Sequence, residues 1–153
     1  MAKKKFFSTS EDIAELAQNI FEQTRLPQIG VNLNVVSVTK AKEVLSIAKE
    51  SAKMEFMTST NDLCTLIIYE EAFDRLNDAG KVKLMEGVLS NVSYDTEKGK
   101  LNVDTSRYGE LMRMRHKYAD YVDVVEASLI AIEQIAEEEK QKKEAGEAEA
   151  EEE

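Results

Sequence analysis

Apolar residues recur at intervals of three and four in the first part of the chain, beginning near residue 11. These positions are Ile13, Leu16, Ala17, Ile20, Phe21 and the polar Thr24. The spacing predicts a helix, because such positions fall on one face of a 3.6-residue repeat. Ser8 or Ser10 can cap its start, and Pro27 and Gly30 close its end.

Two short apolar runs predict strands. Val31 to Val38 is rich in Val and Leu, and Leu63 to Tyr69 has the length of a buried strand. Between these runs we predict a helix over Lys40 to Lys53. Its apolar positions are Val44, Leu45, Ile47 and Ala48.

The second half of the chain alternates between helical spacing and a turn. Glu70 to Leu76 predicts a short helix or turn, and Asn77 or Asp78 can cap the helix that follows. Apolar residues on that helix are Val82, Met85, Val88, Leu89 and Val92.

A hairpin follows, with residues 93–95 and 101–103 flanking a turn in which Gly99 supplies a positive φ. Ser106 to Lys117 predicts a helix. A last helix begins near Tyr121 and frays inside Glu137 to Lys143.

These elements predict an α+β fold: a small mixed sheet of three to four strands packed by helices, with a long C-terminal helix. With 153 residues, 42% of them hydrophobic, the chain suits one domain. We expect a flexible arm over residues 1–8, a single domain over 9–140 and a disordered acidic tail over 141–153. Beyond Ala145 only Gly, Ala and Glu remain, so the tail has nothing to bury.

The net charge of -10 is unevenly distributed. Glu137 to Glu153 contains nine Glu and three Lys, so the folded part is only mildly acidic and is a poor match for phosphate backbones. The basic start, Lys3 to Lys5, has too little apolar sequence after it for a signal peptide, and no stretch has the length of a membrane span. With a single cysteine, Cys64, these features predict a cytoplasmic protein without a membrane partner.

The segment from Asp62 to Val103 carries a series of local motifs. In order they are the strand end Leu66 to Tyr69, the turn residues Phe73, Leu76 and Asp78, the helix segment Lys83 to Glu86, and the hairpin residues Val92, Tyr94, Asp95, Lys98 and Gly99. This series resembles a metallopeptidase domain found in many bacteriophages. The resemblance implies a zincin-like fold and a phage-encoded protein in the host cytoplasm.

The departure from that family lies at its chemistry. A zincin needs two His four residues apart on a helix, with a Glu directly after the first. The matching positions here hold Gly87, Val88 and Asn91, and the only histidine, His116, comes later in the chain. We therefore interpret the chain as a degenerate member with no catalytic residue, no metal ligand and no cofactor.

Two charged groups are candidate binding features. The basic patch consists of Arg107, Arg113, Arg115, His116 and Lys117. These cations either complement the dipole of a helix end, or contact an acidic partner or nucleic acid with Tyr108 and Tyr118 available to stack. The interaction tail, which either aids solubility or engages a basic partner, consists of Glu147, Glu149, Glu151, Glu152 and Glu153.

Three functions from different classes follow. The first is a non-catalytic binding or structural protein that acts through contacts with another protein, viral or host. The second is a nucleic-acid-associated accessory protein with a basic patch and a regulatory acidic tail. The third is a divergent metallopeptidase that uses Asn91, His116 and a carboxylate. The identity of the partner and the oligomeric state are not encoded in any of these patterns.

Overall fold

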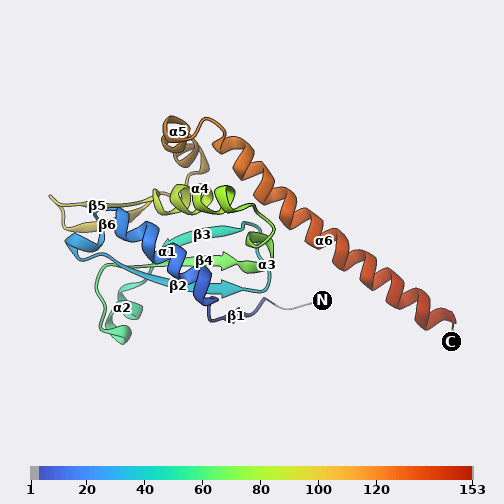
Figure 1. Cartoon of the computed structure of the whole chain (residues 1–153). Helices are drawn as coiled ribbons and strands as arrows, with labels where there is room; N and C mark the ends of the chain where they lie inside the picture. Colours follow the sequence, from blue (N-terminus) through green and yellow to red (C-terminus); the bar gives the residue numbers. More distant parts are fainter. Residues whose placement is uncertain (1–3, 153) are drawn as a thin grey trace.

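A mixed four-stranded sheet is the centre of the molecule, and a long helix extends from one side of it (Figure 1). The computed structural model describes residues 4–152, and the side chains of residues 4–146. The strand order is β1-β2-β4-β3, with a separate β5-β6 hairpin. This arrangement confirms the predicted α+β class and the predicted mixed sheet.

The two strands expected from apolar runs pair with each other. β2 (Asn32–Val38) and β4 (Leu63–Tyr69) run parallel, in a register that places Asn32 opposite Leu63. β4 lies between β2 and β3, and all its residues except Ile67 are buried. A near-continuous apolar run is typical of a strand buried on both faces. This pattern explains why the predicted bounds of β4 agree with the observed ones.

The predicted helix over Lys40 to Lys53 is wrong. Leu45–Lys49 forms strand β3, antiparallel to β4, and a seven-residue helix, α2, follows over Ala52–Thr58. Leu45 and Ile47 are buried two residues apart, which is the strand period. The four apolar residues of this segment fit a helical period and a strand period equally well. Its backbone pairing with β4 is therefore what selects the strand.

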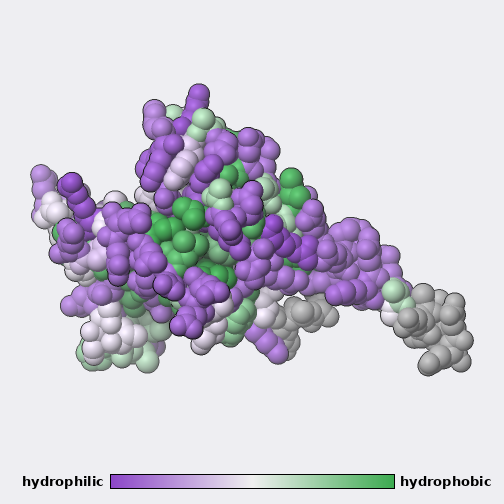
Figure 2. All heavy atoms as spheres, viewed as in Figure 1, coloured by the Kyte–Doolittle hydropathy of each residue, from purple (hydrophilic) through white to green (hydrophobic). Residues whose placement is uncertain are grey.

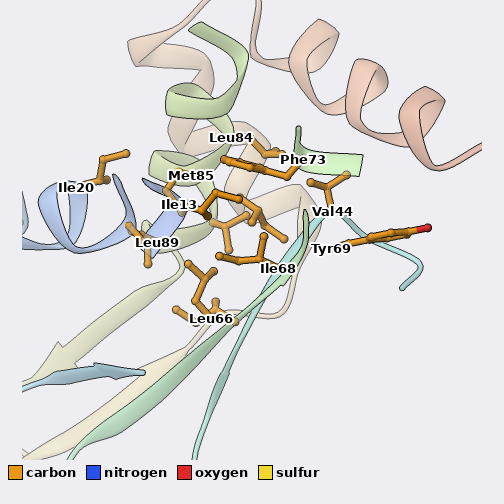
Figure 3. Packing of buried hydrophobic residues seen from close by; sticks show 14 of the residues in the cluster. Ile13, Ile20, Val44, Leu66, Ile68, Tyr69, Phe73, Leu84, Met85 and Leu89 are labelled. Carbon is orange, nitrogen blue, oxygen red and sulfur yellow. The ribbon is translucent and has the colours of Figure 1, made fainter. Parts of the chain in front are cut away.

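Helices α1 (Glu11–Gln23) and α4 (Asp78–Leu89) pack on the sheet and form the core with it. Figure 3 shows this packing, with side chains from α1 and α4 meeting the strand residues Leu66 and Ile68. Both helices begin near their predicted caps. The side chain of Asn77 accepts a hydrogen bond from the backbone N–H of Gly80.

Shorter elements connect this core. A 3-10 turn, η1 (Pro27–Ile29), follows α1, and α3 (Glu70–Phe73) follows β4 directly. The hairpin strands β5 (Val92–Asp95) and β6 (Lys100–Val103) confirm the predicted turn, in which Gly99 has a φ of 61°. α5 (Arg107–Lys117) begins after Ser106, whose hydroxyl accepts a hydrogen bond from the N–H of Gly109.

Both ends of the described chain carry secondary structure. Phe6–Phe7 of the expected arm forms β1, which pairs antiparallel with β2. Helix α6 (Tyr121–Glu152) continues through the segment expected to be a disordered tail. Ala and Glu favour the helical state, so a helix anchored in the domain extends readily along such a sequence. The extending half is strongly hydrophilic, whereas apolar residues gather on the domain (Figure 2).

Candidate functional site: a polar network beside a groove

Helices α4, α5 and α6 meet at the positions that the resemblance assigns to a metal. Gly87 and Val88 lie in the last turn of α4, and Asn91 follows its end. The side chains around these residues come from α5 and from the first residue of α6, Tyr121.

The phenol of Tyr121 occupies the space beside Gly87. A Cβ added to Gly87 would lie 1.8 Å from the Tyr121 hydroxyl oxygen and 2.4 Å from the ring carbon that carries it. Tyr121 is 1% exposed. Only a glycine allows this approach, because any Cβ at this position would overlap the ring.

A buried carboxylate holds the tyrosine in place. The Tyr121 hydroxyl donates to Oε2 of Glu110 over 2.6 Å, and Glu110 is 6% exposed. Burial, followed by the hydrogen bond to Glu110 and then the negative charge of that carboxylate, raises the pKa of Tyr121 well above its usual value. The phenol is therefore a fixed donor across the physiological pH range.

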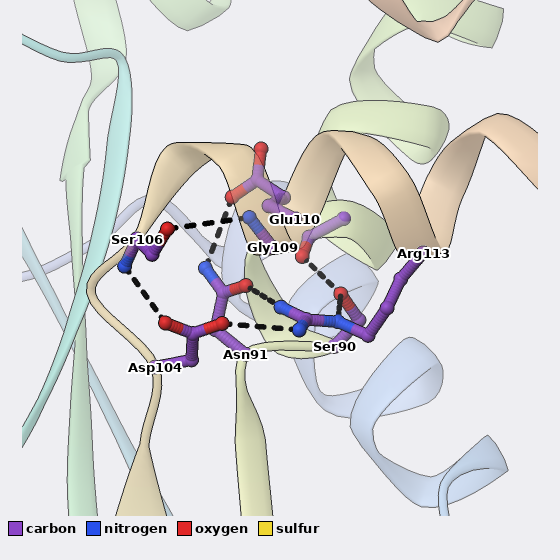
Figure 4. Close-up of polar contacts among 8 residues, drawn as sticks. Ser90, Asn91, Asp104, Ser106, Gly109, Glu110 and Arg113 are labelled. Carbon is purple, nitrogen blue, oxygen red and sulfur yellow. Dashed lines mark hydrogen bonds and ion pairs between the residues drawn. The ribbon is translucent and has the colours of Figure 1, made fainter.

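Asn91 links that carboxylate to a cation. Its amide nitrogen donates to Oε1 of Glu110 over 3.0 Å, and its amide oxygen accepts from Nη2 of Arg113 (Figure 4). Nη1 of Arg113 donates to Oδ2 of Asp104 over 3.1 Å. Nε of Arg113 lies 3.5 Å from Oγ of Ser90, at the long end of hydrogen bonding. The buried charge of Glu110 is thus compensated through a chain of partners.

Asp104 fixes the outer end of this chain. Its carboxylate accepts from the backbone N–H of Ser106 over 2.8 Å, and that bond and the Arg113 guanidinium lower the pKa of Asp104. A Cβ on Gly109 would lie 2.3 Å from the same carboxylate. A second glycine therefore allows close packing in the polar network, defined here as Ser90, Asn91, Asp104, Glu110, Arg113 and Tyr121.

Chemically, the polar network is suited to holding three helices together. Both polar atoms of the Asn91 side chain and both oxygens of Glu110 have partners within it. Among residues whose side chains the structure describes, no group of three or more His, Cys, Asp or Glu is arranged to hold a metal ion.

A groove of about 260 Å³ lies beside the polar network. One wall is the segment Glu43 to Ile47, which leads into and forms β3, and the opposite wall is Asp104 to Arg107. Leu84 and Val88 of α4 contribute apolar lining, and Leu129 contributes from α6. Nη2 of Arg107 and Oε1 of Glu43 form an ion pair of 3.0 Å between the two walls.

The outer edge of the strand along this groove is covered by the rest of the chain. The carbonyl of Val44 accepts a hydrogen bond from the N–H of Tyr69, and the N–H of Glu50 donates to the carbonyl of Leu63. The backbone N–H and C=O groups of the even-numbered residues of this segment therefore point toward β4. Backbone groups alternate in an antiparallel strand, so those of Leu45, Ile47 and Lys49 point away from β4. β3 is the last strand of the sheet, but β6 and the segment from Asp104 to Arg107 lie against this edge, and Leu45 and Ile47 are only 4% and 8% exposed.

The predicted basic patch is largely neutralised within the fold. Arg107 pairs with Glu43, Arg113 with Asp104, and Lys117 with Glu86 over 3.0 Å. The two other members, Arg115 and His116, are exposed at the end of α5. Tyr108 is also exposed, whereas the Tyr118 ring contacts the ammonium groups of Lys83 and Lys117.

The remaining candidates differ in accessibility. Cys64 is fully buried, and burial raises the pKa of its thiol to about 11, so it is a poor nucleophile at neutral pH. The side chains of the predicted interaction tail, Glu147 to Glu153, lie outside the described residues. No helix within residues 4–152 combines the length and the apolarity needed to cross a bilayer.

The resemblance drew attention to Gly87 and Asn91, but the sequence did not indicate which residues pack against them. Glu110 lies on α5 one residue before Leu111 and four before the buried Met114, which was a weak sign of an inward-facing acid. Tyr121 was recognised only as an apolar helix position, because its contact with Gly87 spans 34 residues of sequence.

Comparison with protein-family models, with curated proteins and with solved structures gives no match to this chain.

Proposed function

We propose that this chain is a non-catalytic binding protein on a zincin-like scaffold, encoded by a phage and acting in the host cytoplasm through contacts with another protein. The observation that carries the proposal is the packing of Tyr121 against Gly87, with the Tyr121 hydroxyl bonded to Glu110. The space beside the helix is filled by a side chain of the chain itself.

The arrangement of Asn91 and His116 favours this proposal over a divergent metallopeptidase. The amide of Asn91 is hydrogen bonded on both sides, to Glu110 and to Arg113. His116 is exposed in the last turn of α5, three residues beyond Arg113. Releasing Asn91 for another role would leave the buried carboxylate of Glu110 without one of its donors, which is costly.

The groove beside β3 supplies the contact surface. A side chain of a partner protein can enter the groove between its two walls. Leu84, Val88 and Leu129 offer apolar contact there. Binding of this kind needs a rigid wall, and the polar network holds the Asp104 to Arg107 wall against α5.

Two measurements test the proposal. Elemental analysis of the purified chain is expected to find no stoichiometric zinc, and peptide cleavage that a chelator abolishes is expected to be absent. A displayed library of extended peptides is then panned against the chain, and the affinity of a selected peptide is measured by calorimetry.

Neighbouring residues of α6 provide a matched pair of variants for that calorimetry. Leu129→Arg alters the groove, whereas Ile130→Arg makes the same change at a residue of similar exposure outside it. We expect Leu129→Arg to weaken peptide binding at least tenfold and Ile130→Arg to leave it unchanged. Stoichiometric zinc, or equal binding by the two variants, would contradict the proposal.

A further inference from the structure

Helix α2 presents its apolar side chains to solvent. Phe56 is 86% exposed, Met57 is 68% exposed and Met54 is 43% exposed. No residue of α2 is buried, and the one that is partly buried is the acidic Glu55. A surface helix normally turns its apolar face to the core and its charged residues outward. α2 has the reverse arrangement, so packing within the chain does not explain its apolar side chains.

These side chains form a patch at one end of the molecule. α2 projects from the end of the sheet where β3 ends and β4 begins, far from α5 (Figure 1). The atoms at this end are mostly pale or green in Figure 2, at the lower left, with few hydrophilic atoms among them. Six consecutive residues, 56–61, carry no charge. We call Met54, Phe56 and Met57 the α2 patch.

Polar groups next to the α2 patch are hydrogen bonded to one another. The Thr58 hydroxyl donates to the carbonyl of Met54 over 2.8 Å, and the Thr60 hydroxyl donates to the carbonyl of Thr58 over 3.1 Å. The N–H of Thr60 donates to the carbonyl of Glu55 over 3.0 Å. Polar groups that are already paired leave water at a much lower cost than unpaired ones. These hydroxyls therefore suit contact with an apolar medium better than the hydrogen-bonding rim of a protein interface.

The loop after α2 fixes the patch to the sheet. Ser59 and Asp62 have φ values of 54° and 50°, which turn the chain back toward β4. The side-chain amide of Asn32 donates to the carbonyl of Asn61 over 2.9 Å, and the N–H of Asn32 donates to the carbonyl of Asp62 over 2.9 Å. The α2 patch is therefore held in place before anything covers it, which reduces the entropy lost on binding.

The charge beside the α2 patch is positive. Lys53 is exposed and precedes Phe56 and Met57 by three and four residues, so it lies on the same face of α2. A lysine can lay its apolar stem along such a surface and direct its ammonium group to phosphates. Most of the negative charge lies elsewhere: nine Glu and three Lys over residues 137–153 supply -6 of the net -10. That end of α6 and α2 are at opposite ends of the molecule (Figure 1).

The area of the α2 patch is too small for a dimer. Even at roughly 250 Å² for each large side chain, three of them offer less than the ~800 Å² per partner that a stable protein interface buries. A lipid surface does not require that area, because each apolar side chain that enters it contributes separately.

We propose that α2 contacts the surface of an anionic lipid bilayer, with Met54, Phe56 and Met57 at the boundary between headgroups and acyl chains and Lys53 at the lipid phosphates. The sequence predicted no membrane partner because no segment is long enough to span a bilayer, but a surface contact needs no spanning segment. This role goes beyond the proposed function, and the groove beside β3 takes no part in it.

A single tryptophan reports insertion directly, because the chain contains none of its own. Phe56→Trp is mixed with vesicles of phosphatidylcholine and phosphatidylglycerol in equal amounts. Its emission is expected to shift to the blue and to be quenched by lipids that carry bromine on their acyl chains. Tyr108→Trp places the same reporter on α5, at a residue that is 73% exposed, and its emission is expected to stay unchanged.

Flotation of the full chain with the same vesicles measures the contribution of each residue. Phe56→Ser is expected to weaken binding at least about tenfold, because the burial of one large apolar side chain is lost. Tyr108→Ser is expected to leave binding unchanged. Lys53→Glu is expected to weaken binding to the anionic vesicles about tenfold, and to have much less effect on binding to pure phosphatidylcholine. No residue of α2 is buried, so all variants at α2 should melt at the temperature of the unsubstituted chain.

Three results would overturn the lipid contact. The first is emission of Phe56→Trp that does not respond to vesicles, or equal binding by Phe56→Ser and Tyr108→Ser. The second is a blue shift that grows with protein concentration in the absence of lipid, which would assign the α2 patch to a second copy. The third is a blue shift with a soluble cell extract but not with vesicles, which would assign the patch to a pocket on a protein. The zinc analysis and the Leu129→Arg variant test the proposed function independently of all three.

Discussion

The two halves of helix α6 have opposite relations to the rest of the molecule. The first half presents Tyr121, Val125, Ala131 and Ile135 to the core, and each of these residues is nearly inaccessible to solvent. Beyond the ion pair of Glu138 with Arg75, over 2.6 Å, the helix runs on as an acidic extension away from the domain.

This contrast separates what tertiary packing stabilises from what local propensity allows. The first half is fixed because its side chains fill space between α3, α4 and α5. The second half is helical because Glu, Lys and Ala favour that state, and its contribution to the folded domain is small. Changes at the two ends should therefore differ widely in their effect on stability.

The largest effect is expected at Gly87. Gly87→Ala places a methyl group within 1.8 Å of the Tyr121 hydroxyl oxygen, so the buried ring must move and its bond to Glu110 is lost. Overpacking of this kind should lower the free energy of unfolding by about 3 kcal/mol in a urea titration. Gly146→Ala is the control in the second half of α6, where a Cβ meets nothing within 4 Å. If both variants had the same stability, the close packing around Gly87 would be contradicted.

A smaller effect is expected when only the hydroxyl is removed. Tyr121→Phe keeps the ring but leaves Oε2 of Glu110 buried without this donor, which should cost about 1–3 kcal/mol. The same titration measures it. A double variant with Glu110→Gln should lose less than the sum of the single changes, because the two groups interact. Strict additivity would show that the contact contributes nothing.

Alkaline pH should weaken the folded domain, in part through Tyr121 at the start of α6. The pKa values of Tyr121 and Cys64 are raised in the folded chain, so above about pH 9 the folded state holds protons that the unfolded state releases. Stability is therefore retained below that pH and falls as the pH rises further. Thermal melts from pH 7 to pH 10.5 should show this decline, and Tyr121→Phe should make it shallower. A profile that is equally steep in the variant would remove Tyr121 as a cause.

The smallest effect is expected in the acidic extension. Deleting residues 144–153 should change the free energy of unfolding by less than about 0.5 kcal/mol, since surface changes away from packed features have little effect. The same deletion also tests the nucleic-acid alternative.

Three members of the basic patch are already paired within the fold, so DNA binding should not appear in the chain that lacks residues 144–153. Salt-sensitive binding that emerges on deletion would favour that alternative.

The sequence predicted most of the fold where one signal was sufficient. β4 and α4 have apolar runs or caps that point to one structure, and the hairpin has a glycine at the position that needs a positive φ. β3 was missed because its apolar residues fit both periods, and only pairing with β4 selects the strand. Local pattern also could not predict where the acidic helix ends.

For the candidate site, the sequence indicated which positions cannot bind a metal, but not which side chains surround them. Gly87 and Asn91 were readable as positions without ligands, since their chemistry is evident from residue type alone. Their contacts with Tyr121 and Glu110 depend on how α5 and α6 are placed against α4. Such placement comes from packing over the whole domain, and no spacing rule within one segment contains it.

The extension of α6 also acts as a spacer. At about 1.5 Å per residue, the stretch beyond Glu138 carries the chain roughly 20 Å from its last ion pair with the domain. A rod of that length keeps its negatively charged end from folding back over the groove. Any partner that binds the charged tip would therefore sit well clear of a partner held in the groove, and both could be engaged at once.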